Sequence, residues 1–209
     1  MDYLQQLIKR YPALDSIRDD IAAAYRILEE SFEAGGKLLI AGNGGSAADA
    51  DHIVGELMKG FVKKRPLPAS FLSRLEEISP DCAPRIGPVL QQGLPAIALS
   101  AHTALSTAYL NDVGTDTLYA QQVYGYGNEG DVFLGISTSG NSNNILYAAL
   151  TAKAGNMKTI ALSGGSGGAL AKAADAAIIA PETETYKIQE LHLPIYHALC
   201  LMLEEHFFP

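Results

Sequence analysis

Two segments far apart in the chain carry side chains suited to proton transfer or metal binding. In the first, His52 and Glu56 are four residues apart and therefore share one face of a helix. In the second, Gln189 and His197 are eight residues apart, a little over two helical turns, and again lie on one side. Imidazole, carboxylate and amide oxygen are suitable ligands for a first-row divalent metal. A carboxylate with an imidazole is also the usual acid–base pair for moving a proton beside a carbonyl.

Two turns rich in glycine and serine could bind an anion. Gly42–Ser46 follows the apolar run Leu38–Ala41, and Ser137–Ser142 follows the apolar run Val132–Ile136. Both precede helical patterns, so unpaired backbone N–H groups and hydroxyls can face a phosphate there. Ordinary turn and N-cap chemistry favours the same residue types, but two such turns at strand ends of one sheet favour phosphate. Neither matches the dinucleotide fingerprint or the Walker lysine motif, so neither NAD nor ATP is expected.

The other histidines, His102, His192 and His206, are expected to be satisfied core residues rather than ligands. His102 begins a helical pattern near the predicted site, so this expectation is least secure for that residue. The spacing of His52 and Glu56 is by itself a weak sign of zinc.

Short apolar runs alternate with helical patterns after residue 36, which predicts a parallel sheet covered by helices on both faces. Ligands of such sheets gather at the carboxyl ends of the strands. The expected strands are Lys37–Ala41, Pro95–Leu99, Asp131–Ile136, Lys158–Leu162 and Ala176–Ala180. The expected helices are Ser46–Lys59, Thr103–Asn111, Ser142–Ala154, Gly168–Ala173 and Thr185–Phe207.

Two regions stand outside this alternation within what we interpret as one domain, residues 1–209. Residues 1–34 form an amphipathic helical region that is broken near Tyr11-Pro12. Residues 61–93 contain several prolines and one short helical pattern around Ser70–Ile78, and we interpret them as an inserted excursion. Its run Lys63-Lys64-Arg65-Pro66 is expected to be a solvated basic surface on a mobile linker.

Composition excludes several functional classes. The formal charge of −8 argues against general binding to nucleic acid or an anionic membrane, and no apolar stretch reaches transmembrane length. The acidic balance also means that a phosphate site must be built locally from backbone and hydroxyl donors. Cys82 and Cys200 are too few for a disulfide framework, and the first residues lack the features of a secretion signal. A cytoplasmic protein is expected.

Three segments, Ala41–Glu56, Gly130–Ser142 and Ile188–His197, together resemble the sugar isomerase (SIS) domain family. Within that family the chain is most similar to the sedoheptulose 7-phosphate isomerases. This resemblance implies a three-layer, flavodoxin-like α/β fold with a five-stranded parallel sheet, and a homotetramer with active sites at subunit interfaces. It implies conversion of D-sedoheptulose 7-phosphate to D-glycero-D-manno-heptose 7-phosphate, the entry to activated heptose for lipopolysaccharide, S-layer or capsule.

The same resemblance assigns expected roles to individual residues. Ser137, Thr138, Ser139 and Ser142 would hold the phosphate. Asn43, Gly44, Ser46, Gln189 and Asp112 would be further substrate contacts. His52, Glu56, Gln189 and His197 match the zinc ligands of the zinc-binding members. Glu56 and His197 match the catalytic base and acid.

This chain departs from the family pattern at three places. The stretch Val62–Gly93 is longer than in the short members of the family. Lys59-Gly60-Phe61 stands where Gly-Arg-Tyr is frequent, and Tyr186-Lys187 stands where an Asp-Arg pair is common. These changes put a basic substrate contact, and with it the choice of substrate or metal, in doubt. The last helix is apolar on more than one side, which predicts burial against both the sheet and neighbouring subunits.

Three alternatives to a heptose isomerase remain open at this point. The first is a catalytically silent SIS protein that binds a partner, such as the relatives associated with the replication initiator. Those relatives look as though they lose the glutamate and the last histidine, whereas Glu56 and His197 are present here. The second is a phosphosugar-sensing regulator, for which the chain offers no DNA-binding segment. The third is an isomerase of another ketose phosphate, which the same motifs would serve equally well.

Overall fold

Five short apolar runs form one parallel sheet in the computed structural model, which describes residues 2–209. The strand order is β2-β1-β3-β4-β5, and every neighbouring pair is parallel. The strands are β1 (Leu38–Gly42), β2 (Ala96–Ala98), β3 (Val132–Ile136), β4 (Lys158–Gly164) and β5 (Ala176–Ala180). All five expected strands are therefore present, and the expected three-layer α/β architecture is confirmed.

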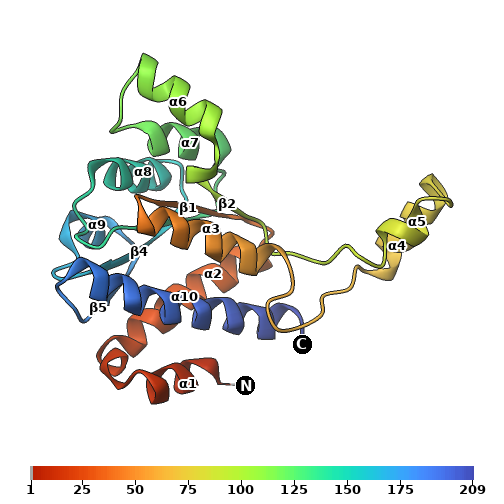
Figure 1. Cartoon of the computed structure of the whole chain (residues 1–209), viewed down its shortest axis with the longest axis horizontal. Coiled ribbons are helices and arrows are strands. Elements are labelled where there is room, and N and C mark those ends of the chain that lie inside the picture. The colour runs from red at the N-terminus through yellow and green to blue at the C-terminus, as the bar shows by residue number, and fades with distance from the viewer. Residues whose placement is uncertain (1) are drawn as a thin grey trace.

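Alternation along each strand divides the core into two clusters, one on each face of the sheet. In β1, Leu38 and Ile40 enter one cluster, while Leu39 and Ala41 enter the other. The first face is covered by α1 (Tyr3–Arg10), α2 (Arg18–Glu33), α3 (Gly45–Met58) and α10 (Thr185–Phe207) (Figure 1). The second is covered by α7 (Leu118–Tyr126), α8 (Asn143–Ala154) and α9 (Gly168–Ala173). Because both faces are covered, the strands are nearly continuous apolar runs.

The chain changes direction across the sheet between β1 and β3. From β1 it passes through α3 to β2 at one side, whereas β3 lies on the other side of β1 and leads through α8 to β4. The last residues of β1 and β3, Gly42 and Ile136, are paired in register. The turns after these two strands therefore begin side by side at the carboxyl edge, where ligands of such folds bind.

Three short elements complete the body of the protein. Two are 3-10 helices, η1 (Pro12–Ile17) and η2 (Leu99–Ala101), and the third is α6 (Thr103–Asp112). No residue of α6 is buried, and α6 stands at the outer edge of the α7–α8 layer (Figure 1). Within residues 2–209, no helix is both long enough and apolar enough to cross a membrane.

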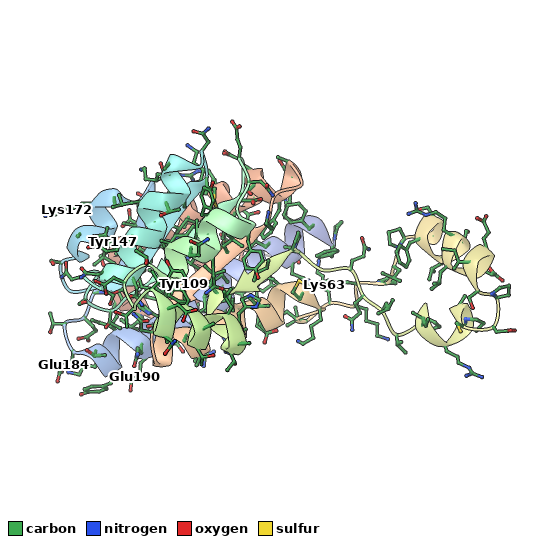
Figure 2. The ribbon with its side chains drawn as sticks, turned by 90° about the horizontal axis from the view of Figure 1, so that it is seen from above. Lys63, Tyr109, Tyr147, Lys172, Glu184 and Glu190 are labelled. Carbon is green, nitrogen blue, oxygen red and sulfur yellow. The ribbon has the colours of Figure 1, made fainter. Side chains whose placement is uncertain are left out.

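Residues 61–93 leave the body as an arm that carries α4 (Ala69–Ile78) and α5 (Ala83–Ile86). The arm projects from the body in both views (Figures 1 and 2), and Lys63 marks its root. None of the α4 residues is buried, and Ile78 is 80% exposed. The expectation of a solvated basic run is wrong for Arg65, which is fully buried because it pairs with a carboxylate on α10.

Candidate active site

The structure brings the two segments with acid–base side chains together, because α3 and α10 pack against each other. His52 Nε2 lies 3.2 Å from Glu56 Oε1 on the same helix. The same nitrogen lies 3.4 Å from Nε2 of His197 on α10. The Glu56 carboxylate is 14% exposed and also lies 3.4 Å from the ammonium group of Lys59. Two imidazoles and one carboxylate thus form a single cluster at the junction of two helices.

Tyr196 and Asp49 extend this cluster, and sequence reasoning missed both. The buried Tyr196 hydroxyl lies 3.0 Å from His52 Nδ1 and donates a hydrogen bond to Asp49 Oδ1 at 3.3 Å. Burial raises the pKa of Asp49, although the hydrogen bond from Tyr196 and the nearby His52 oppose this. Because Tyr196 engages Nδ1, it orients the His52 ring with Nε2 toward Glu56 and His197. The one sequence feature that could have indicated Asp49 is its spacing from His52, since the two residues are three apart and share a helix face.

The surroundings of His197 favour its neutral form. Burial lowers its pKa, the neighbouring His52 lowers it further, and Glu56 acts in the opposite direction. The Phe61 ring packs against the imidazole with a centroid separation of 5.4 Å. A neutral imidazole keeps one N–H donor and one acceptor nitrogen, so His197 can serve either as a ligand or in proton transfer.

The glycine turn at residues 43–46 lies beside α10 through Gln189. A Cβ built on Gly45 would stand 2.6 Å from Gln189 Nε2, so the amide packs directly on the turn. Gly44 has a backbone φ of +57°, a conformation that residues other than glycine rarely adopt. Asn43 exchanges amide hydrogen bonds of 3.0 and 2.9 Å with Asn144 of α8. Ser46 is buried in the first turn of α3.

The serine turn at residues 137–142 carries several hydroxyl groups and packs closely against the backbone at Gly167. Ser137 Oγ lies 3.2 Å from Ser142 Oγ, and the Ser142 side chain makes no capping bond to α8. Gly140 has φ of +65°, and a Cβ there would overlap the backbone of Gly167. Ser139 is exposed, and Thr138 is partly buried. Hydroxyls therefore gather at a helix start beside the glycine turn, an arrangement suited to an anion.

Asp112 is the one predicted substrate contact that the structure leaves apart from the others. It is exposed at the end of α6, and its carboxylate accepts a hydrogen bond of 2.8 Å from its neighbour Asn111. A single copy of the chain thus does not bring Asp112 into either turn.

The remaining histidines divide into three cases. His192 is a fully buried core residue as expected, with Nε2 3.1 Å from the Ser163 carbonyl oxygen. The expectation is wrong for His206, which lies at the surface between Glu29 and Glu33 at 3.1 and 2.9 Å. The sequence did not indicate this position because the carboxylates that bind His206 lie on α2, far from it along the chain. His102 is partly buried, and its Nε2 has no hydrogen-bond partner among the described residues.

A cleft of about 440 Å³ opens on the α1 side of His197. Its walls include Tyr3, Arg10, Phe61 and Leu193. The lining contains neither the glycine turn nor the serine turn. We therefore do not identify this cleft with a phosphate site, although it borders His197 of the acid–base cluster.

The distances around His52 bear on whether a divalent ion could bind there. Across residues 2–209, no group of three or more His, Cys, Asp or Glu side chains, the acid–base cluster included, is placed to hold a metal ion as the side chains stand. However, tetrahedral zinc with bonds of about 2.0–2.1 Å places neighbouring ligand atoms about 3.3 Å apart. The two separations from His52 Nε2, 3.2 Å to Glu56 and 3.4 Å to His197, agree with that spacing. Tyr196 at Nδ1 supplies the orienting partner that metal-binding histidines usually have.

Comparisons with known proteins agree with the family resemblance. A family model described as "SIS domain" matches residues 2–85 and 75–164. The chain is 38% identical over 195 residues to phosphoheptose isomerase from Helicobacter pylori, covering 93% of this chain and 88% of that protein. It is 42% identical over 179 residues to phosphoheptose isomerase 2 from Campylobacter jejuni, covering 86% and 76%.

Solved structures agree with the sequence relatives. A phosphoheptose isomerase from Francisella tularensis superposes with a TM-score of 0.77 and 34% identity, covering 97% of this chain and 95% of that one. The enzyme from Neisseria gonorrhoeae gives a TM-score of 0.75 and 31% identity, covering 96% and 94%. With identity above 30% over most of each chain, the protein belongs to the SIS domain family and, within it, to the phosphoheptose isomerases.

Proposed function

We propose that this protein interconverts D-sedoheptulose 7-phosphate and D-glycero-D-manno-heptose 7-phosphate. The observation that carries the proposal is the meeting of Glu56, His52 and His197 from two distant helices. Catalytically silent relatives are expected to lack this acid–base pair. The adjacent turns at the sheet edge supply a second, separate place for the phosphate. An aldose–ketose isomerase needs both parts, whereas a protein that only binds phosphosugars needs only the turns.

The reaction moves one proton between two carbons and one between two oxygens. Glu56 takes the proton from C1, and the electron pair of that bond forms the C1–C2 double bond of a cis-enediol. Glu56 then returns the proton to C2. As the C1–C2 double bond forms, the π electrons of the C2 carbonyl pass to O2, which takes a proton from His197. When Glu56 returns its proton to C2, His197 takes back a proton from O1 and the C1 carbonyl forms. Positioned acid–base groups of this kind contribute about 10²–10⁴-fold in rate.

The phosphate is held by neutral donors in this proposal. Ser137, Thr138, Ser139 and Ser142, with the backbone N–H groups at the start of α8, would donate hydrogen bonds to its oxygens. The protein carries a net charge of −8, so its overall field does not attract the substrate. Hydrogen bonds to a charged group contribute about 1.5–3 kcal/mol each, so three or four of them suffice for a phosphate. Asn43, Gly44, Ser46 and Gln189 would contact the sugar.

We further propose one zinc ion per subunit, held by His52, Glu56, Gln189 and His197. A bound zinc ion would polarise the substrate carbonyl as a Lewis acid. Support comes from the donor chemistry and the two ligand separations described above. Metal analysis of the purified protein tests this, and each of His52→Ala and His197→Ala is expected to reduce the bound metal.

The proposed assembly is a homotetramer in the cytoplasm with shared active sites. Exposed apolar side chains on and beside α6, α7 and α8 support self-association: Leu105, Leu110, Val113, Tyr124, Tyr126, Tyr147 and Leu150. Asp112 lies among them, where it could serve the site of a neighbouring copy. Both cysteines are unpaired, in keeping with a reducing compartment. Light scattering at micromolar concentration tests the assembly, and a clean monomer would contradict it.

One assay tests the activity itself. The protein is incubated with ketose phosphates of five, six and seven carbons, with and without zinc, and aldose formation is followed. Turnover of the heptose phosphate well above the others supports the proposal. Turnover of a different sugar would reassign the substrate, and no turnover of any would favour a phosphosugar-binding protein.

A further inference from the structure

A buried ion pair stands between the active-site helices and the root of the arm. Arg65 and Glu204 have side chains that are both 0% exposed. Arg65 Nη2 and Nε lie 2.8 and 2.9 Å from Glu204 Oε1. The Phe208 ring covers the guanidinium group with its centroid 4.5 Å away.

The remaining donors of Arg65 reach the end of α3. Nη1 donates to the Leu57 carbonyl at 2.7 Å, and Nη2 donates to the carbonyl of Glu56 itself at 3.2 Å. Carbonyls in the last turn of a helix have no partner within that helix. A guanidinium group can satisfy two of them at once because its donors are rigid and planar. Arg65 therefore holds the backbone from which the Glu56 side chain extends.

Glu204 does the same for the first residues of the arm. Its carboxylate accepts backbone N–H bonds from Phe61 at 2.8 Å, Val62 at 2.9 Å and Lys63 at 3.2 Å. Phe61 in turn packs its ring on His197. Glu204 lies two turns beyond His197 on α10, so one carboxylate ties the arm root to the helix that carries the second catalytic group.

Stability alone does not explain this pair. The free-energy cost of removing two charges from water offsets most of the attraction between them. Well-packed apolar residues in their place often stabilise a protein equally well. What apolar residues do not provide is directed bonding to two carbonyls and three N–H groups. We propose that Arg65 and Glu204 are positioning residues that set the relative placement of Glu56 and His197 by joining the end of α3, the arm root and α10. This inference rests on the proposed isomerase function.

The test uses Arg65→Lys in the full-length protein. Lysine keeps the charge opposite Glu204, but its single ammonium group does not reproduce the planar set of donors to both carbonyls. The turnover number is expected to fall by up to about 10²-fold, because a displacement of a catalytic group by about 1 Å produces a loss of that size. The Michaelis constant should stay unchanged, because the serine turn lies on other elements. Glu204→Gln provides a second variant if Arg65→Lys fails to fold, with the same expectation.

Lys63→Met is the matched control. Lys63 also joins the arm root to α10, through an exposed pair with Glu205 at 2.8 Å, but it reaches neither α3 nor the cluster. Its removal should leave turnover and the Michaelis constant unchanged. A purely structural role for Arg65 would lower the melting temperature of Arg65→Lys while leaving turnover intact well below that temperature, and this result would overturn the proposal.

A second readout separates this inference from the proposed function. Nitrogen-15 spectra of the histidine side chains report the surroundings of His52 and His197 without any substrate. The imidazole signals should shift in Arg65→Lys and not in Lys63→Met. If the wild-type protein fails to isomerise heptose phosphate, the proposed function is wrong. The comparison of imidazole signals between Arg65→Lys and Lys63→Met still tests the positioning role of Arg65 and Glu204. Unchanged imidazole signals in a folded Arg65→Lys protein would overturn it.

Discussion

Replacing Glu56 with glutamine separates a catalytic carboxylate from an ordinary helix residue. The amide has nearly the size of the carboxylate but does not accept a proton from carbon. We expect the turnover number to fall by at least about 10²-fold, the lower end of the range for a general base. That loss corresponds to about 2.7 kcal/mol in activation free energy.

The structure predicts a much smaller effect on stability. The pair between Glu56 and Lys59 spans 3.4 Å, and the Lys59 side chain is 58% exposed. Exposed pairs of this kind contribute at most about 1 kcal/mol. Glutamine can also keep a hydrogen bond to His52. The free energy of unfolding should therefore change by less than the activation free energy, and the oligomer should persist.

The assay measures steady-state turnover of heptose phosphate, thermal melting and bound metal on the same preparations. Glu190→Gln is the matched control, because Glu190 is an exposed acid on α10 that points away from the body (Figure 2). It should leave all three quantities unchanged. Full activity of folded Glu56→Gln would refute the proposed mechanism. If activity persists while the amount of bound metal falls, the metal takes no part in the reaction.

Three further results are expected. Replacing Ser139 and Ser142 with alanine should raise the Michaelis constant at least about tenfold per serine, since each lost bond to phosphate costs about 1.5–3 kcal/mol; an unchanged constant would return both to turn chemistry. Gly45→Ala should lower turnover with little change in melting temperature, because its Cβ would stand 2.6 Å from the flexible end of Gln189. Burial lowers the pKa of His192 from 6.5 to about 4, so the unfolded state binds the proton first. Unfolding free energy should therefore drop by about 3 kcal/mol as pH falls from 6.5 to about 4, and His192→Gln should remove that contribution.

Strands and long helices could be predicted from sequence because their signals are local. The runs at β5, α9 and α10 have the bounds that periodicity and glycine punctuation indicate. The helix α7 was missed. Its buried residues Leu118, Tyr119 and Ala120 are consecutive, and Gln122 is buried among apolar neighbours, so no apolar stripe of helical period appears.

The shared helix face of the candidate acid–base residues could be predicted, but the residues that pack against them could not. Tyr196 sits in an apolar helix and looks like core until α3 is placed beside it. Arg65 sits in a basic run that is typical of solvated surface, and its partner Glu204 is close to the other end of the chain. Spacing along one helix reveals a shared face, whereas contacts between helices depend on how they pack. The joining of the two segments came from the family resemblance and not from periodicity.

The two ends of the substrate are recognised by different kinds of element in the proposed function. The phosphate would rest on turns fixed to the paired ends of β1 and β3, Gly42 and Ile136, which move only with the sheet. The carbonyl would meet side chains on α3 and α10, whose packing depends on Tyr196 and on the Arg65–Glu204 pair. In this proposal, the separation between the serine turn and the acid–base cluster would determine which length of sugar phosphate fits. Changes in the Arg65–Glu204 pair should therefore alter turnover and preference for chain length, while changes in the serine turn should weaken binding of all phosphosugars alike.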